Sequence, residues 1–526
     1  MKLVLNGHDE RYVVEQSLMA LFPGELPVYE PICPGDDDWA VVTLAEETEG
    51  CRITVELALG GKSASRTLTA RLSGTDFEKE GQRRHAMARC FFLAARDVTG
   101  ATPPWGMLTG VRPDKPVTWA LAEGKSPEEA RKMLEKEYFV TPERSALALE
   151  TGETALRAIR RLSPRDIDIY VGIPFCPTRC VYCSFVSQSV EKSFALVPPY
   201  VEALAAELRA GGEMVRRAGL RVRSFYMGGG TPTTLTAEQM DTVLTAFESS
   251  FDLTDCTERT VEAGRPDTIT PEKLAVLRSH GVDRVSVNPQ SMSDAVLAAM
   301  GRAHRAADIL GAFALVRESG IGCVNMDLIA GLPGDSADGF RSSLDQVLAL
   351  APENVTVHTL ALKKGSRLMN GAPNKGKALV GERTSGGMSE LPWKQGSEGY
   401  KAREDEGETP LPPGEDVAAM LDYAWRALRE SGQIPYYLYR QKYMSGSFEN
   451  VGWCLPGTES LYNICMMEEL HTIVSLGGGG VTKLVDRHTG YIQRVANAKY
   501  PQEYIQKIDA ICADKARVAE FCRQHG

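Results

Sequence analysis

The chain has 526 residues and carries 59 basic against 69 acidic side chains, which gives a formal net charge of −10. This length exceeds that of one ordinary domain, so two or three domains are expected. The acidic balance argues against a nucleic-acid-binding protein. No apolar run is long enough for a membrane span, and residues 1–21 lack the apolar core of a signal peptide. We therefore expect a cytoplasmic protein whose 12 cysteines are free thiols or metal ligands.

The first 108 residues predict a small α/β domain. Residues 39–44, 51–59 and 65–72 alternate between polar and apolar side chains as strands do, and a glycine turn at 60–63 joins the last two. Residues 77–99 then predict a helix. Its basic cluster, Arg83, Arg84 and His85, is typical of a solvated face. We therefore expect no chemistry in this domain.

A helical connector over residues 109–165 leads into a regular alternation of strands and helices over 166–365. The strands are predicted at 167–175, 222–227, 259–262, 284–288, 324–329 and 355–360, and sequences with helical spacing lie between them. Six strand–helix steps predict a parallel sheet curved into a full or partial barrel. In such barrels the active site lies at the carboxyl ends of the strands.

Three cysteines, Cys176, Cys180 and Cys183, follow the first barrel strand at C-x3-C-x2-C spacing. Three thiolates in one short loop can hold a four-iron cluster and leave one iron open to a small molecule. Structural zinc is the alternative, but it needs a fourth ligand, usually from a second cysteine pair or a histidine pair. The nine other cysteines are scattered and none repeats the spacing. We rank the cluster above zinc, and zinc above no metal.

These residues resemble the signature of the radical S-adenosylmethionine (SAM) enzymes, which also have an aromatic residue before the last cysteine, here Tyr182. The string Tyr170-x-x-Ile173-Pro174-Phe175-Cys176 is similar to the branch that contains oxygen-independent coproporphyrinogen III dehydrogenase, HemZ-type proteins and haem chaperones. The resemblance implies an α/β fold, a partial (β/α)6 barrel with an N-terminal α/β domain and a mainly helical C-terminal domain.

Taken singly, the residues at the other strand ends have ordinary explanations: a triple glycine is usually a turn, an acid often caps a helix, and an arginine is often a surface cation. The resemblance implies instead that they bind SAM beside the [4Fe-4S] cluster. The implied cofactor-binding residues are Tyr170, Tyr182, Gly229, Gly230, Thr231, Glu262, Gln290, Arg302 and Asp327. One SAM molecule or two are implied, the second near Gly230 and Thr231.

The C-terminal third begins with a polar, glycine-rich stretch at residues 370–413, which predicts a flexible insertion. Residues 414–526 predict a substrate-side domain, in which 461–475 form a helix. The tyrosine-rich string 436–443 predicts either a pocket for a flat, anionic ligand or a packing strand. Arg440, Lys442 and Lys363 are the candidate partners of substrate carboxylates.

The resemblance implies an oxidoreductase of haem biosynthesis that converts two propionate side chains of coproporphyrinogen III to vinyl groups and yields protoporphyrinogen IX. Its electrons would come from a flavodoxin or ferredoxin. Two alternatives in the same superfamily stay open: a haem chaperone, whose C-terminal His-Asn-x-x-Tyr-Trp motif is absent here, and an enzyme that acts on another tetrapyrrole. A zinc-stabilised structural protein is the third alternative.

Overall fold

The computed structural model describes residues 1–22, 25–184, 188–362, 366–370, 411–441 and 448–525. It divides the chain into two compact units. The described part of the first is mainly Met1–Thr109 with Tyr138–Val140, and the second contains Gly110–Glu137, Thr141–Leu368 and Pro412–Gly526. Within the described residues, no helix combines the length and the apolarity that crossing a membrane requires.

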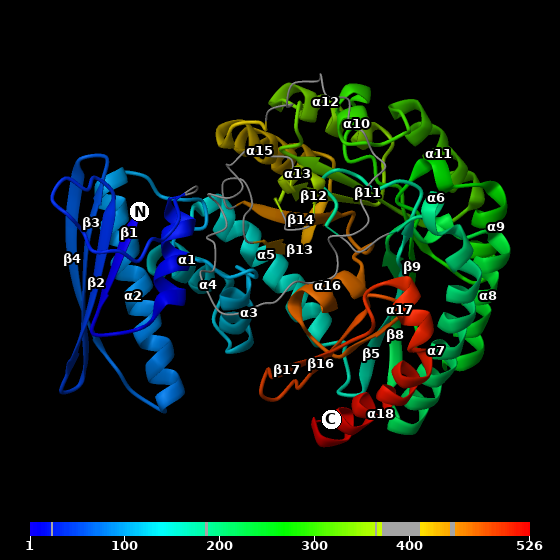
Figure 1. Ribbon diagram of the computed structural model, residues 1–526, viewed down its shortest axis with the longest axis horizontal. Coiled ribbons are helices and arrows are strands. Elements are labelled where there is room, and N and C mark those ends of the chain that lie inside the picture. The colour runs from blue at the N-terminus through cyan, green and yellow to red at the C-terminus, as the bar shows by residue number, and fades with distance from the viewer. Residues whose placement is uncertain (23–24, 185–187, 363–365, 371–410, 442–447, 526) are drawn as a thin grey trace. The chain divides into compact units, whose positions relative to one another are not determined.

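The first unit is a four-stranded sheet in the order β1-β2-β3-β4 with helices on one face (Figure 1). Its elements are β1 (Lys2–Asn6), α1 (Arg11–Leu21), β2 (Trp39–Glu47), β3 (Gly50–Leu59), β4 (Lys62–Arg71) and α2 (Asp76–Thr99). Alternate residues of β3, such as Ile53 and Val55, are fully buried against α2, which explains the period of two in the sequence. The expected strands and helix are present, and β1 and α1 come in addition.

The second unit is built on an eleven-stranded sheet in the order β13-β14-β12-β11-β10-β9-β8-β5-β15-β16-β17. Its six central parallel strands are β5 (Asp166–Ile173), β8 (Arg221–Gly229), β9 (Glu258–Glu262), β10 (Arg284–Ser286), β11 (Cys323–Ala330) and β12 (Asn354–Thr359). They pair side by side in chain order, as the sequence predicts. Among the described strands, β13 and β17 pair on one side only, so the barrel is partial and open.

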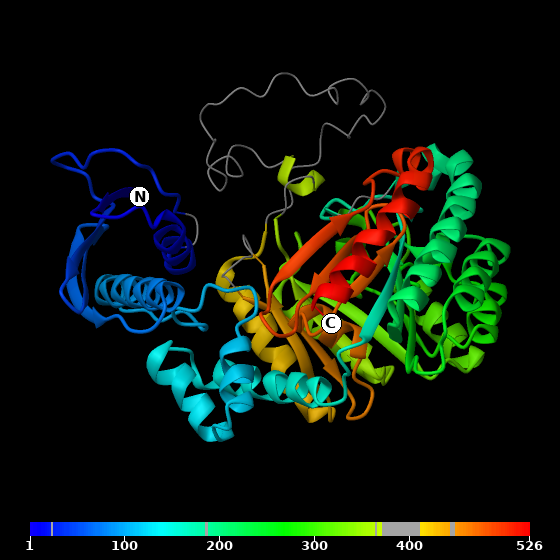
Figure 2. The same ribbon diagram turned by 90° about the horizontal axis from the view of Figure 1, so that it is seen from below.

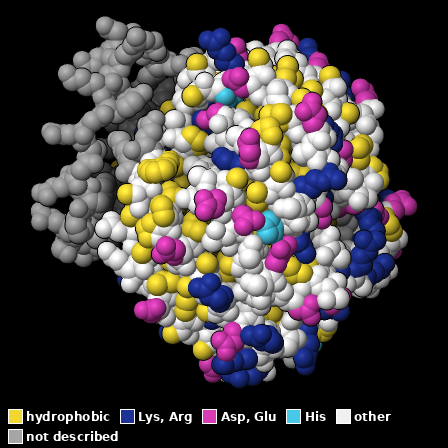
Figure 3. Space-filling model, turned by 90° about the vertical axis from the view of Figure 1, so that its right-hand side faces the viewer, with side chains coloured by type: hydrophobic (Ala, Val, Ile, Leu, Met, Phe, Trp, Pro, Cys, Tyr) yellow, Lys and Arg dark blue, Asp and Glu magenta, His cyan; other side chains and the backbone are white. Residues whose placement is uncertain are grey.

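Helices cover the outer face of this sheet (Figures 1 and 2). They are α7 (Val197–Ala218), α8 (Ala237–Ser250), α9 (Pro271–Ser279), α10 (Asp294–Ala299), α11 (Ala306–Ser319) and α12 (Ala337–Ala349). The connector that precedes the barrel supplies α3 (Lys115–Ala122), α4 (Pro127–Glu137) and α5 (Pro142–Ile159). Basic and acidic side chains are interspersed over the face shown in Figure 3, which is typical of a solvated surface.

The C-terminal part contributes strands to both edges of the sheet as well as helices. Its elements are α15 (Gly414–Glu430), β13 (Ile434–Arg440), β14 (Glu449–Cys454), α16 (Leu461–Glu468), β15 (Ile473–Leu476), β16 (Val481–Val485), β17 (Ile492–Ala496), α17 (Pro501–Gln506) and α18 (Ile508–His525). β14 pairs antiparallel with β12 at one edge, and β15 pairs parallel with β5 at the other. The tyrosine-rich string therefore begins as a strand of the sheet. The expected flexible insertion falls almost wholly outside the described residues.

The single helix predicted over 461–475 is wrong in its second half. α16 ends at Glu468, and β15 begins at Ile473. Glu469 takes a left-handed backbone with φ of 54°, and its carboxylate is 2.8 Å from Arg112 and 3.6 Å from Lys483. These distant cations hold a backbone conformation that a glutamate rarely adopts, so no local pattern could show where the helix ends.

Candidate active site

A cavity of about 400 Å³ lies at the carboxyl ends of the parallel strands and brings the cysteine loop together with the predicted strand-end residues. Its walls include Cys176, Tyr182, Glu262, Gln290 and Asp327. The wall also contains the other predicted residues Cys180, Cys183, Gly229, Gly230, Thr231 and Arg302. Six segments that are far apart in the sequence therefore converge on one site, where the barrel rule places chemistry.

The cysteine loop is held by backbone hydrogen bonds to its neighbours. Cys176 ends the short strand β6 (Phe175–Cys176), which pairs with β7 (Gln188–Ser189), next to the short helix α6 (Val190–Ser193). The Val181 amide donates to the Met300 carbonyl at 3.2 Å, and Val181 in turn accepts from the Leu368 amide in α13 (Arg367–Asn370) at 2.9 Å. All 12 cysteines are free thiols, so no disulfide competes for the three in this loop.

The donor set fits a cluster better than a single metal ion. A zinc ion brings its thiolates to about 2.3 Å from itself, so their sulfurs lie roughly 4 Å apart. Among the described residues, Asp168, Cys465 and His471 form the one group of three potential ligands whose donor atoms all lie within 4.8 Å of one another. The sulfurs of Cys176, Cys180 and Cys183 do not form such a group. Thiolates spaced more widely suit a cluster, because each then binds a different iron.

The glycine motif allows the β8 turn to pack directly on the cysteine strand. A Cβ at Gly230 would lie 2.5 Å from the Phe175 carbonyl oxygen, which is closer than atoms can approach. The Gly230 and Thr231 amides donate to the carbonyls of Ile173 and Phe175 at 2.8 and 2.7 Å. The Thr231 hydroxyl lies 3.5 Å from the Cys176 sulfur. The glycine is thus required by the approach of two backbones, whatever ligand the cavity holds.

Glu262 and Asp327 form an acidic wall. The Tyr226 hydroxyl donates to Glu262 at 2.6 Å, and the Asn325 side-chain amide donates to Asp327 at 2.7 Å. Burial raises the pKa of Glu262 to about 7, and nearby Asp327 adds to the rise although the Tyr226 hydrogen bond opposes it. Glu262 therefore changes charge near neutral pH. A carboxylate at this position can accept hydrogen bonds from the hydroxyls of a ligand.

Gln290 carries an unpaired polar atom into the site. Its backbone is left-handed, with φ of 67°, and is fixed by hydrogen bonds with Asp327 and Ile329 at 2.8 and 3.0 Å. The side-chain oxygens of Gln290 and Asn288 are buried and have no partner among the described residues. Buried polar atoms are normally hydrogen-bonded. These two therefore indicate a polar ligand, which fits SAM.

Arg302 joins the cysteine loop to the segment after β10. Its guanidinium donates to the Asn288 carbonyl and to the Tyr182 hydroxyl, both at 3.0 Å. Burial lowers the pKa of Arg302, but Tyr182 and Cys180 together raise it above its ordinary value. A permanent cation beside the cysteine loop therefore favours any anionic group of a ligand bound there.

Sequence analysis missed several residues of the site. Arg265 is buried, with 4 % of its surface exposed. It donates to Thr178 in the cysteine loop at 3.0 Å and to Asp267 at 2.9 and 3.1 Å. The tyrosine-rich string, for which a pocket was one of two predicted alternatives, adds Tyr437 and Tyr439 to the wall. Both lie on it because alternate residues of a strand face the same side.

Two predicted residues are not on the cavity wall, and two more fall outside the described residues. Tyr170 is not on the cavity wall, and its ring packs beside the stacked pair of Tyr226 and Tyr462, with its centre 6.3 Å from each of theirs. Arg440 alternates with Tyr439 along β13 and points away from the cavity, and burial lowers its pKa to about 10 despite nearby Glu449. Its role as a substrate contact stays a prediction. Lys363 and Lys442 lie outside the described residues.

Comparison with known proteins identifies the class first. The model of the radical SAM superfamily matches residues 170–347, the part of the chain that carries the cysteine loop and most of the cavity. Membership of this superfamily implies a [4Fe-4S] cluster and SAM as cofactors. The residues on the cavity wall fit both groups.

The family follows from one relative in particular. The oxygen-independent coproporphyrinogen-III oxidase-like protein HemZ of Bacillus subtilis is 37 % identical, and the match covers 99 % of this chain and 98 % of that protein. The chain therefore belongs to the HemZ-type family of oxygen-independent coproporphyrinogen-III oxidase-like proteins. The haem chaperone HemW of Bacillus subtilis is 33 % identical over 37 % of this chain and 50 % of its own length. The structure of coproporphyrinogen III oxidase (HemN) from Escherichia coli matches with a TM-score of 0.47 and 21 % identity, over 70 % of this chain and 78 % of that one.

Proposed function

We propose that this protein is a radical SAM oxidoreductase that oxidatively decarboxylates two propionate side chains of coproporphyrinogen III and releases protoporphyrinogen IX. The observation that carries the proposal is the convergence of Cys176, Cys180 and Cys183 on one cavity with the unpaired buried oxygens of Asn288 and Gln290. The full-length similarity to the HemZ-type relative supports the choice of substrate. The reaction belongs to haem biosynthesis, and we place it in the cytoplasm, where thiols stay reduced.

The cysteines and the polar residues of the wall have proposed roles in holding the cluster and SAM. Cys176, Cys180 and Cys183 would hold the cluster, which together with SAM supplies one-electron cleavage and hydrogen abstraction when bound. Glu262 accepts hydrogen bonds from ligand hydroxyls. The buried side-chain oxygens of Gln290 and Asn288 accept hydrogen bonds from donors of the ligand. The positive charge of Arg302 stabilises an anionic group of the ligand beside the cysteine loop.

The remaining residues orient the substrate and exclude water. Tyr437 and Tyr439 stack nearly parallel, with ring centres 6.4 Å apart, and close the side of the cavity formed by β13. A flat tetrapyrrole can lie against such faces. Each decarboxylation removes a hydrogen atom and carbon dioxide from a propionate and leaves one electron, which needs an acceptor. A reduced flavodoxin or ferredoxin is the proposed donor to the cluster, and a second SAM beside Gly230 and Thr231 is part of the proposal.

An anaerobic turnover assay tests this function. The reconstituted protein, SAM and a reductant are mixed with coproporphyrinogen III, and products are followed by mass spectrometry. Loss of two carbon dioxide units together with methionine formation is expected, and Cys180→Ala should abolish both. Cleavage of SAM without any change in the porphyrinogen would reject the substrate and leave another tetrapyrrole as the target.

A haem chaperone is the second candidate, favoured by the match to HemW over 37 % of this chain. A chaperone would bind haem tightly and leave it unchanged. If protein that carries its cluster binds haem and does not turn over coproporphyrinogen III under the same conditions, the chaperone replaces the oxidoreductase. Decarboxylation in the assay would reject the chaperone as the main activity.

A further inference from the structure

A second group of potential metal ligands lies in the same unit, away from the cysteine loop. It consists of Asp168 on β5, Cys465 on α16 and His471 just before β15. Their donor atoms all lie within 4.8 Å of one another. Asp168 lies near the amino end of β5, and Cys176 follows its carboxyl end. At about 3.3 Å per residue, the two are on the order of 25 Å apart along the strand. The group is therefore separate from the cavity described above.

The three side chains are buried and incompletely paired. Asp168 and Cys465 have no exposed surface, and His471 has 1 %. Asp168 Oδ2 and His471 Nε2 share a hydrogen bond of 2.7 Å. Asp168 Oδ1 and His471 Nδ1 are buried and have no hydrogen-bond partner among the described residues. Buried polar atoms without partners cost folding free energy. A ligand that binds these two atoms would therefore stabilise the fold.

We propose that Asp168, Cys465 and His471 bind a divalent transition-metal ion, with zinc as the best match. Sulfur, imidazole nitrogen and carboxylate oxygen are the three ligand types that zinc takes in proteins. A zinc dication with one thiolate, one carboxylate and a neutral imidazole has no net charge, which suits a buried position. Binding converts the Cys465 thiol to a thiolate and releases its proton to solvent.

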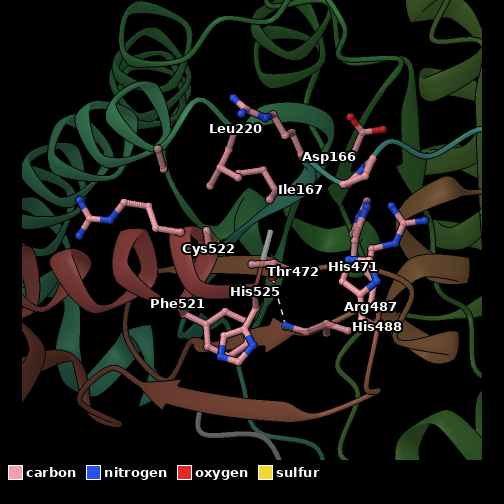
Figure 4. A pocket seen from close by; sticks show the side chains of 15 residues that line it. Asp166, Ile167, Leu220, His471, Thr472, Arg487, His488, Phe521, Cys522 and His525 are labelled. Carbon is pink, nitrogen blue, oxygen red and sulfur yellow. Dashed lines mark hydrogen bonds between the residues drawn. The ribbon is translucent and has the colours of Figure 1, made fainter.

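The neighbouring cavity gives the ion a route into the site. His471 forms part of the wall of a cavity of about 450 Å³, shown in Figure 4. Arg487, His488 and His525 line the same space. Three protein ligands leave one position of a tetrahedral zinc ion open, and a water molecule from this cavity can occupy it. Burial, together with Asp168, raises the pKa of the Cys465 thiol well above its ordinary value, and Arg487 offsets only part of the rise. The proton therefore leaves only when an ion takes its place.

The backbone around the site is already fixed. The Asp168 amide donates to the Thr472 carbonyl at 3.2 Å, and Asp168 lies opposite Ile473 in the pairing of β5 with β15. Asp168 and His471 are therefore held close together before any ion binds. Such an ion would join β5, α16 and the start of β15, which are more than 290 residues apart in the chain at their extremes.

The test uses a full-length variant in which Cys176, Cys180 and Cys183 are all alanine, so that the cluster loop cannot bind metal. Zinc is titrated against a competing chelator, and bound metal is measured by elemental analysis. We expect about one tightly held zinc per chain, and about a 100-fold loss of affinity in the further variant Cys465→Ser. Cys454→Ser is the matched control, because Cys454 is equally buried but belongs to no ligand group, and it should retain the zinc.

Cobalt gives a second measurement, which begins with the three proposed ligands intact. In the same cluster-free protein, Co²⁺ should produce a thiolate-to-cobalt charge-transfer band and d–d bands of tetrahedral intensity, and Asp168→Asn should weaken the d–d bands. Absence of the charge-transfer band in the folded parent would overturn the proposal. So would zinc binding that survives Cys465→Ser and His471→Gln equally. Neither measurement depends on SAM cleavage, so the outcome is independent of the proposed oxidoreductase activity.

Discussion

The Tyr182 hydroxyl lies 3.0 Å from the Arg302 guanidinium, which links the cysteine loop to the segment after β10. The same arginine donates to the Asn288 carbonyl. One buried cation therefore positions residues from two sides of the cavity, and its fork geometry makes lysine a poor substitute.

Arg302→Lys is expected to weaken SAM binding by about tenfold, because a lysine retains the charge but cannot make both hydrogen bonds. Tyr182→Phe should lose a smaller part of the affinity, since only one of the two bonds is removed. Equilibrium binding of SAM to cluster-loaded protein measures both effects. Arg209→Lys, on the exposed face of α7, is the control and should bind as the wild type does. Unchanged binding in Arg302→Lys would remove the arginine from the SAM site.

The pH dependence of SAM binding should contain a component from Glu262. Its pKa is raised to about 7 by burial, so the carboxylate forms only as pH rises through neutrality. Because hydrogen bonds to a charged acceptor are stronger by about 1 kcal/mol, affinity should increase roughly fivefold between pH 6 and 8. Asp327, His358 and Tyr226 also face this group. The difference between wild type and Glu262→Gln isolates its part, and identical pH profiles would contradict the assignment.

Most of the barrel could be predicted from sequence because its strands are short apolar runs buried on both faces. Such runs are recognisable without knowledge of their partners. The strand ends could be predicted for the same reason, since the barrel rule turns a sequence position into a spatial one. Glu262, Gln290 and Asp327 meet at one cavity as a consequence.

The parts that could not be predicted depend on long-range contacts. Arg265 contacts Thr178 across 87 residues of chain, and nothing near either residue points to the other. The end of α16 depends on the cations around Glu469. In the tyrosine-rich string, the alternation of β13 places Tyr437 and Tyr439 on the cavity wall and leaves Arg440 off it. Residue type showed possible chemistry, and only the fold showed which side chains share a cavity.

The buried carboxyl groups of Asp114 and Glu468 should make stability depend on pH. They contact each other, and burial raises the pKa of Asp114 to about 6 and that of Glu468 well above its usual value. Folded protein thus holds protons that unfolded protein releases, so their contribution to stability is complete below about pH 4 and falls as pH rises through 6. Nearby Arg112 and Lys115 oppose the rise.

Glu468→Gln removes one of the two acids while keeping its size. The variant should be more stable than the wild type at pH 8 by about 1–3 kcal/mol and nearly equal to it at pH 4.5. Urea unfolding at the two pH values measures the difference. Glu202→Gln, exposed on α7, is the control and should show no such change. An equal effect of Glu468→Gln at both pH values would show that the raised pKa values of the pair do not govern stability.

Glu207 connects α7 to the C-terminal segments through hydrogen bonds and an ion pair. Its replacement should lower the free energy of unfolding more than replacement of any surface acid on the same helix. Its buried carboxylate accepts from the Gly477 amide and the Asn497 side chain, each at 2.7 Å, and pairs with Lys515 at 2.5 Å. Glu207→Ala leaves the Lys515 ammonium buried without its counter-charge, so a loss of about 3–5 kcal/mol is expected in urea unfolding. Adding Lys515→Met to Glu207→Ala should recover part of the lost unfolding free energy, because the unpaired buried charge is removed. Glu213→Ala, which breaks only a surface ion pair with Arg217 on α7, should cost less than about 0.5 kcal/mol. Equal costs for the two alanine variants would show that the buried network adds nothing to stability.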